Sequence, residues 1–379
     1  DRIRELGHQP LLIDVGTLKE PQVKPDISRE IVLTDAGVEL PAEEDRGQRV
    51  GAMAKALPIF LAKLVTAGRI DAVISLGGGG GTAIATAGMR ALPIGFPKLM
   101  VSTLASGNTA HYVGTKDIVM FPSIVDVAGL NLISETIFSR AAGAICGMAT
   151  AKAASSGGKP LIVASMFGNT TECVDNARKQ LEAAGYEVLV FHATGTGGRT
   201  MESLIESGMV AGVLDITTTE WADELVGGVL SAGPERLDAA GKAGIPAIVT
   251  PGCLDMANFG ERETLPAEFE GRNIYIHNPQ VTLLRTNADE CARLGKILAE
   301  KVNAYTGPVT VLLPMKAISI ISAEGQPFYD PAADKALFDA IRTNLSDQVK
   351  LVELDTEINS PEFAAACADA LLENLKKSG

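Results

Sequence analysis

Short runs of β-branched and other apolar residues alternate along this chain with stretches that have the periodicity of amphipathic helices. The apolar runs predict strands at 11–15, 71–76, 98–102, 161–165, 187–191, 212–216, 247–250, 309–313 and 349–354. Amphipathic helices are expected between them, for example at 47–66, 171–184, 331–345 and 361–377. This alternation is typical of parallel sheets with crossover helices. The sequence therefore predicts an α/β fold of doubly wound parallel sheets.

The order of landmarks repeats in the two halves of the chain. GHQPLLIDVGT at 7–17 aligns with GYEVLVFHATG at 185–195, GRIDAVISLG at 68–77 with GMVAGVLDIT at 208–217, and GFPKLMVST at 95–103 with GIPAIVTPG at 244–252. Three matches in one order indicate two Rossmann-like domains related by internal duplication. We expect the joint in the small-residue stretch at 150–160, which gives domains of 1–155 and 156–379.

The alignment leaves the first half without the strand and turn that open the second half. We therefore expect about 20 residues, roughly a strand and the start of its helix, to be missing before residue 1.

Composition excludes several classes of function. The net charge is −13 and no basic cluster stands out, whereas binding to nucleic acid phosphates calls for positive charge. No apolar run reaches the roughly 18 residues of a membrane-spanning helix. The five cysteines are far apart and show no metal-ligand spacing, so we expect reduced thiols in a cytoplasmic protein without a metal site.

Five consecutive glycines follow the strand expected at 71–76 and precede a helix. Glycine is costly to hold in one conformation, so the run requires a reason. The backbone N–H groups of a strand–helix turn, together with the positive end of the helix, form a site for an anion such as phosphate. We expect a nucleotide there, held by Gly77, Gly78, Gly79, Gly80, Gly81 and the hydroxyl of Thr82. The alternative is a tight turn that only lets the helix pack.

The segment that follows the next expected strand, 98–102, is rich in small polar residues. In a doubly wound sheet this segment and the glycine run both follow the carboxyl ends of strands, so we expect them to lie side by side. Ligands bind beyond these strand ends. Ser102, Thr103, Ser106 and Gly107 are therefore further candidates for binding the nucleotide. Such residues also bond their own backbone in loops, and the sequence does not separate the two interpretations.

The second half has its own glycine-containing turn, in which an arginine lies in the first turn of the expected helix. A cation at a helix N-terminus is unfavourable unless an anion binds there. We therefore predict a site for a carboxylate or phosphate, formed by Thr194, Gly195, Thr196, Gly197, Gly198, Arg199, Thr217, Thr218 and Thr219. His192 and Glu220 are the candidates for proton transfer, with a structural histidine and an ordinary first-turn acid as the alternatives.

Several long motifs together resemble one family. They are LGGGGGTAIATAGMRALPIGFPKLMVST, VLVFHATGTGGRTMESLI, LDITTTEWADELVGGVLSAGPERL, IHNPQVTLLRT and PMKAISIISAEGQPFYDPAADKALF. The chain is similar over nearly its whole length to the family of tomato mosaic virus replication inhibitor-like ATP-binding domains. The resemblance implies two Rossmann-like domains, ATP binding by the N-terminal one, and a homodimer. Family members also begin with a strand and a Gly-Thr-x-Asp-Thr-Lys loop that this sequence lacks.

Three functions are compatible with these observations. The first is nucleotide binding on the glycine run, with Mg²⁺ arriving on the nucleotide. The second is an enzyme that acts on a small anionic metabolite in a cleft between the domains, with or without ATP. The third is a module for protein–protein interaction. The sequence names neither a substrate nor a reaction.

Overall fold

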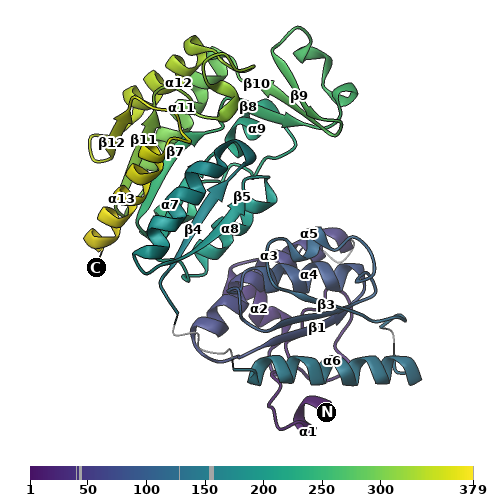
Figure 1. The fold of residues 1–379 in the computed structure, drawn as a ribbon. Coiled ribbons are helices and arrows are strands. Elements are labelled where there is room, and N and C mark those ends of the chain that lie inside the picture. The colour runs from purple at the N-terminus through teal and green to yellow at the C-terminus, as the bar shows by residue number, and fades with distance from the viewer. Residues whose placement is uncertain (40, 42–44, 128, 153–157, 379) are drawn as a thin grey trace. The chain divides into compact units, whose positions relative to one another are not determined.

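The computed structural model describes residues 1–39, 41, 45–127, 129–152 and 158–378. The chain forms two compact units, Asp1–Ser155 and Ser156–Gly379, which are described separately (Figure 1). Both have an α/β architecture with parallel strands, as the alternating pattern predicted.

The first unit is built on a three-stranded parallel sheet. Its strands are β1 (Val73–Gly77), β2 (Lys98–Ser102) and β3 (Val119–Pro122), in the order β1-β2-β3. The helices are α1 (Arg2–Glu5), α2 (Arg29–Ala36), α3 (Arg46–Thr66), α4 (Gly79–Arg90), α5 (Ala110–Val113) and α6 (Leu132–Thr150).

Successive residues of β2 point to opposite faces of this sheet, as the pleat of a strand requires. Leu99 and Val101 pack against Ala141 and Ile145 of α6, whereas Met100 packs on the other face among residues of α4. Helix α3 lies against α4 and adds a further apolar layer. Helices thus cover both faces of the sheet (Figure 1).

The prediction of a strand at 11–15 is wrong. Only Ile13 forms a bridge, to Ile27, and this segment is otherwise irregular. The cause is local. The Asp14 carboxylate accepts hydrogen bonds from the backbone N–H of Gly16 at 2.8 Å and from the Arg29 guanidinium at 2.7 Å, and these bonds interrupt the extended backbone.

The second unit contains a six-stranded parallel sheet in the order β12-β11-β7-β6-β4-β5. Its strands are β4 (Leu161–Met166), β5 (Glu187–His192), β6 (Gly212–Thr217), β7 (Ala247–Gly252), β11 (Val309–Pro314) and β12 (Lys350–Leu354). Each was expected within one or two residues. The chain builds the sheet outward from β4 in both directions, so the topology switches between β4 and β6.

Two apolar cores lie on the two faces of the six-stranded sheet. Ile248 and Leu312 face the core that includes α7 and α13, whereas Val249 and Val311 face the core that includes α9, α11 and α12. The helices are α7 (Thr171–Ala183), α8 (Thr196–Glu206), α9 (Glu220–Val226), α10 (Ala239–Ala243), α11 (Ala288–Asn303), α12 (Pro331–Asn344) and α13 (Pro361–Ser378).

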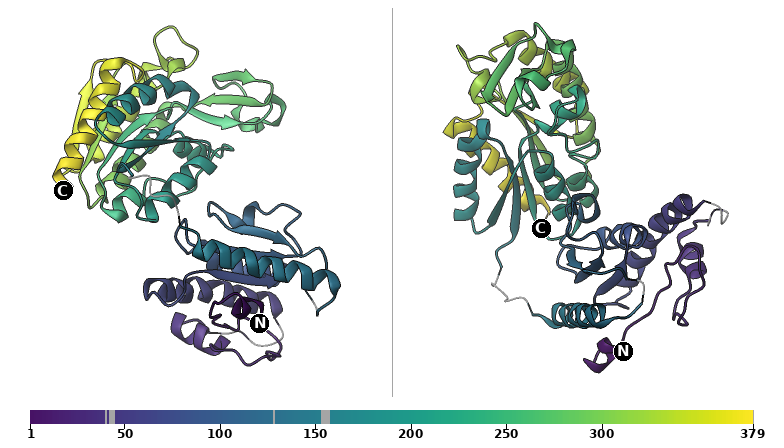
Figure 2. Two further views of the ribbon diagram at one scale, coloured as in Figure 1. Left: turned by 60° about the horizontal axis from the view of Figure 1, so that its bottom comes forward. Right: turned by 90° about the vertical axis from the view of Figure 1, so that its right-hand side faces the viewer.

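A small antiparallel sheet in the second unit was not predicted. It consists of β8 (Met256–Phe259), β9 (Ile274–Asn278) and β10 (Val281–Arg285), in the order β8-β10-β9. Figure 2 shows the β9–β10 hairpin (green) projecting from the rest of this unit. The sequence pattern predicts no strand there, because polar residues such as Asn258, His277 and Asn278 interrupt the apolar runs.

The five cysteines, Cys146, Cys173, Cys253, Cys291 and Cys367, are all buried and free. Within the described part of the chain, no helix combines the length and the apolarity needed to cross a bilayer.

Candidate functional site

The carboxyl ends of the three strands of the first unit meet at one edge of their sheet. Gly77 pairs with Ser102 across β1 and β2, and Ser102 pairs with Pro122 across β2 and β3. The register therefore brings the glycine run beside the polar exit of β2.

Helix α4 begins inside the glycine run, with Gly78 as its N-cap. The backbone N–H of Thr82 donates to the carbonyl of Gly78 at 2.8 Å and closes the first turn. For the N–H groups of Gly79, Gly80 and Gly81, the described part of the chain supplies no acceptor. These groups lie at the positive end of a helix, a position that favours negative charge.

The fold itself requires only the first of the five glycines. A Cβ on Gly77 would lie 2.8 Å from the Cα of Gly81, so this glycine lets β1 and α4 approach closely. On Gly78, Gly79, Gly80 and Gly81, a Cβ would meet its nearest neighbour at 3.7, 3.8, 3.6 and 3.7 Å, which is ordinary contact. None of these four has a positive φ. Neither packing nor backbone conformation therefore explains why they are glycine.

Two of the hydroxyls expected to bind a ligand are used inside the fold. The Oγ1 of Thr82 and the Oγ of Ser102 are buried and lie 2.7 Å apart, and the Oγ of Ser102 also accepts from the Leu104 N–H at 3.0 Å. They join α4 to β2. Gly107 donates its N–H to the carbonyl of Leu104 at 3.1 Å and closes a turn in the loop. The side chains of Thr103 and Ser106 remain exposed.

A pocket of about 410 Å³ lies at the ends of β2 and β3. Thr103 and Ser106 contribute to its wall, and Asp126 brings a carboxylate. The remaining lining residues are Ser102, Pro122, Ser123, Ile124 and Val125. The pocket is polar and adjoins the glycine run, because Ser102, which lines the pocket, pairs with Gly77 across β1 and β2.

The glycine-containing turn of the second unit already holds an anion of the protein's own. The Oε1 of Glu220 accepts from the N–H groups of Gly195 and Gly198, at 2.7 and 3.0 Å. A Cβ on Gly198 would lie 2.1 Å from the Oε2 of Glu220, so glycine is required there to admit the carboxylate. Two of the N–H groups that the sequence predicts to bind an external anion, those of Gly195 and Gly198, thus donate to Glu220.

The other residues expected at this turn also bond within the protein. The guanidinium of Arg199 donates to the carbonyl of Ser231 at 2.8 Å and to the Thr196 hydroxyl at 3.2 Å. Thr194 donates to the carbonyl of His192 at 3.3 Å, and a Cβ on Gly197 would lie 1.7 Å from that same oxygen.

The three threonines at the end of β6 and directly after it are fully buried. The hydroxyl of Thr217 lies 2.8 Å from that of Thr170, Thr218 donates to the carbonyl of Thr250 at 3.0 Å, and Thr219 donates to the carbonyl of Met256 at 3.2 Å. They tie β6 to its neighbours and do not face solvent.

Sequence reasoning missed the group that holds this region together. Arg236 is 1% exposed and makes a bidentate contact to Asp215 on β6, with both N–O distances at 2.6 Å. It also donates to Glu220 at 2.7 Å and to Glu202 of α8 at 3.0 Å. Burial would lower the pKa of Arg236, but the three carboxylates outweigh burial and hold this pKa well above its ordinary value.

The structure places the two candidates for proton transfer differently. Glu220 is 1% exposed, is paired with Arg236 and accepts two backbone N–H groups, so its carboxylate is held inside the protein. His192 lies exposed at the end of β5, an edge strand. The signal that could have revealed the network is Asp215, an acid inside an apolar strand. Across the described residues, no group of three or more His, Cys, Asp and Glu side chains could hold a metal ion.

Comparisons with known proteins agree with the resemblance found from the sequence. Residues 1–154 match the N-terminal domain of the uncharacterised protein family UPF0261, and residues 159–375 match its C-terminal domain. A UPF0261 protein of Clostridium tetani is 49% identical over 382 residues, which cover 100% of this chain and 95% of that protein. A UPF0261 protein of Rhizobium meliloti is 46% identical and covers 97% of this chain and 92% of its own length. The ToMV resistance protein Tm-1(GCR237) of Solanum lycopersicum is 44% identical over 88% of this chain, which matches 45% of the tomato protein.

Replacing Arg236 with Met should lower the free energy of unfolding of the second unit by about 3–5 kcal/mol, because the two buried carboxylates of Asp215 and Glu220 and the partly buried one of Glu202 lose their counter-ion. The protein's single tryptophan reports on this site, since the Trp221 indole donates to the Arg236 carbonyl at 3.2 Å. Urea unfolding followed by tryptophan fluorescence measures the loss. Arg199→Met, at an exposed arginine nearby, is the control and should change stability little. Equal losses for the two variants would contradict this role of Arg236.

A second prediction concerns the pH dependence of stability. Burial raises the pKa of Asp223 from 3.8 to about 7, against hydrogen bonds from Asn258 and Leu230 that lower it. A raised carboxyl pKa stabilises the fold while the group is protonated, so this contribution is complete below about pH 4 and is lost as the pH rises to about 7. The stability of Asp223→Asn relative to wild type should therefore increase over this interval, as measured by urea unfolding at each pH. A constant difference from pH 4 to 8 would show that Asp223 does not titrate there.

Proposed function

The chain belongs to the uncharacterised protein family UPF0261, and from that premise we propose that its N-terminal unit binds a nucleotide, in the first place ATP. The phosphates would lie on the glycine run at the start of α4. The observation that carries this proposal is the set of four glycines, residues 78–81, which the fold does not require.

Electrostatics favours a phosphate at this position. The open N–H groups of residues 79–81 and the helix dipole both attract negative charge, and no carboxylate among the described residues occupies the place that Glu220 takes at α8. Without side chains, these glycines let a phosphate approach the backbone closely. Each glycine within a helix costs roughly 0.5–1 kcal/mol relative to alanine, a cost that ligand binding would explain.

The adjoining pocket would take the rest of the ligand. Its volume of about 410 Å³ is within the range of small-molecule sites. The exposed hydroxyls of Thr103 and Ser106 can bond a phosphate or a sugar, and the carboxylate of Asp126 can bond ribose hydroxyls or a nucleotide-bound Mg²⁺. Thr82 and Ser102 would support the site through their mutual hydrogen bond.

The double variant Gly79→Ala/Gly80→Ala tests the proposal. Alanine is a better helix former than glycine, so the melting temperature of the double variant without ligand should equal or exceed that of wild type. The two methyl groups should nevertheless obstruct the phosphates, so the rise in melting temperature that ATP and Mg²⁺ cause in wild type should be lost.

Gly143→Ala on α6 is the matched control, because a Cβ there meets no atom within 4 Å. It should retain the full response to ATP. Gly77→Ala should destabilise the protein even without ligand, because its Cβ would lie 2.8 Å from Gly81. The proposal fails if wild type shows no rise with any nucleotide, or if the double variant responds as wild type does.

A further inference from the structure

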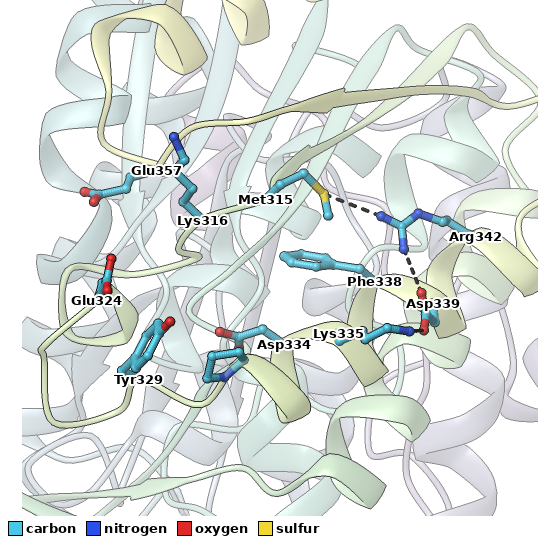
Figure 3. A pocket seen from close by; sticks show the side chains of 11 residues that line it. Met315, Lys316, Glu324, Tyr329, Asp334, Lys335, Phe338, Asp339, Arg342 and Glu357 are labelled. Carbon is cyan, nitrogen blue, oxygen red and sulfur yellow. Dashed lines mark hydrogen bonds and ion pairs between the residues drawn. The ribbon is translucent and has the colours of Figure 1, made fainter.

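The second unit contains a pocket of about 450 Å³ beyond the ends of β11 and β12 (Figure 3). It is lined by Met315, Lys316, Glu324, Tyr329, Pro331, Asp334, Lys335, Phe338, Asp339, Arg342 and Glu357. Eight of these residues come from the stretch PMKAISIISAEGQPFYDPAADKALF at 314–338. This motif contributes to the family resemblance, and nucleotide binding on the glycine run does not involve it.

The pocket combines apolar walls with one buried acid. Phe338 and Met315 provide apolar surface, and Tyr329 is 44% exposed. Asp334 is 7% exposed, and its Oδ1 accepts from Arg285 at 2.6 Å. Its Oδ2 accepts no hydrogen bond from any residue described. Figure 3 shows Asp334 between the rings of Tyr329 and Phe338.

The cations of the pocket are already paired. Lys335 and Arg342 both bind Asp339, and Lys316 lies 3.4 Å from Asp355. Two carboxylates of the lining, those of Glu324 and Glu357, form no ion pair with any described residue. The charge that remains unneutralised is therefore negative.

Carboxylates beside apolar and aromatic surface suit one class of ligand. An ammonium group gains charge-assisted hydrogen bonds from carboxylates and attraction from the face of an aromatic ring, while an aliphatic stem packs against apolar walls. An anion would instead meet Glu324, Glu357 and the free oxygen of Asp334. We propose that this pocket binds a small organic cation, namely a primary ammonium group on a short aliphatic stem.

The ionisation of the buried acid sets the pH of the test. Burial raises the pKa of Asp334 to about 6, although Arg285 lowers it. At pH 7.5 this carboxylate is therefore mainly ionised, as binding of a cation requires.

Isothermal titration of the full chain at pH 7.5 tests the proposal with 1,4-diaminobutane and n-butylammonium as probes. Both should bind saturably, whereas n-butanol and butyrate, which lack the ammonium group, should not. The double variant Glu324→Gln/Glu357→Gln should bind 1,4-diaminobutane about tenfold more weakly, because two exposed ion pairs of ordinary strength are lost. Both glutamates are exposed, so this variant should fold normally.

Two further variants complete the experiment. Glu362→Gln, at an exposed position in the first turn of α13, is the charge-matched control and should bind as wild type does. Asp334→Asn should lose more affinity than the double variant, with near-UV circular dichroism confirming its fold. The proposal is overturned if neither amine binds, if butyrate binds in their place, or if the double variant retains wild-type affinity.

Discussion

The backbone N–H groups at the start of a helix need acceptors that the helix itself cannot provide. Two helices of this protein, α8 and α4, differ in whether the described chain provides those acceptors. In the second unit, Glu220 inserts its carboxylate against the N–H groups of Gly195 and Gly198, and Arg236 holds Glu220 in place. In the first unit, the start of α4 receives no acceptor from the described chain. The same local geometry is thus closed by the protein in one unit and open in the other.

The closed turn explains why so much charge is buried in the second unit. Arg236 links Asp215 of β6, Glu202 of α8 and Glu220 of α9, next to the point where the sheet reverses its direction of growth. Ligands of doubly wound sheets usually bind at this switch point. Here side chains of the protein occupy it. A buried ion-pair network contributes little net stability compared with apolar packing, but removal of one member leaves the other charges uncompensated.

Much of the fold could be predicted from the sequence, because strand–helix alternation depends on local apolar periodicity. All six strands of the large sheet, together with β1 and β2, were predicted close to their observed positions. The prediction of a strand at 11–15 failed because Asp14 bonds its own loop, and the β8–β10 sheet was missed because polar residues interrupt its short apolar runs. For the candidate sites, the sequence identified both glycine-containing turns. It could not show that Glu220 fills one of them, because the acceptor lies more than twenty residues away along the chain.

Binding at the open turn of the first unit is the central claim, and amide NMR of glycine-labelled protein tests it most directly. With ¹⁵N-glycine in the full chain, titration with ATP and Mg²⁺ should shift the amide signals of Gly79, Gly80 and Gly81 saturably. The signals of Gly195 and Gly198 should not move, because their N–H groups already donate to Glu220. Shifts at Gly195 and Gly198 with none at residues 79–81 would contradict the account.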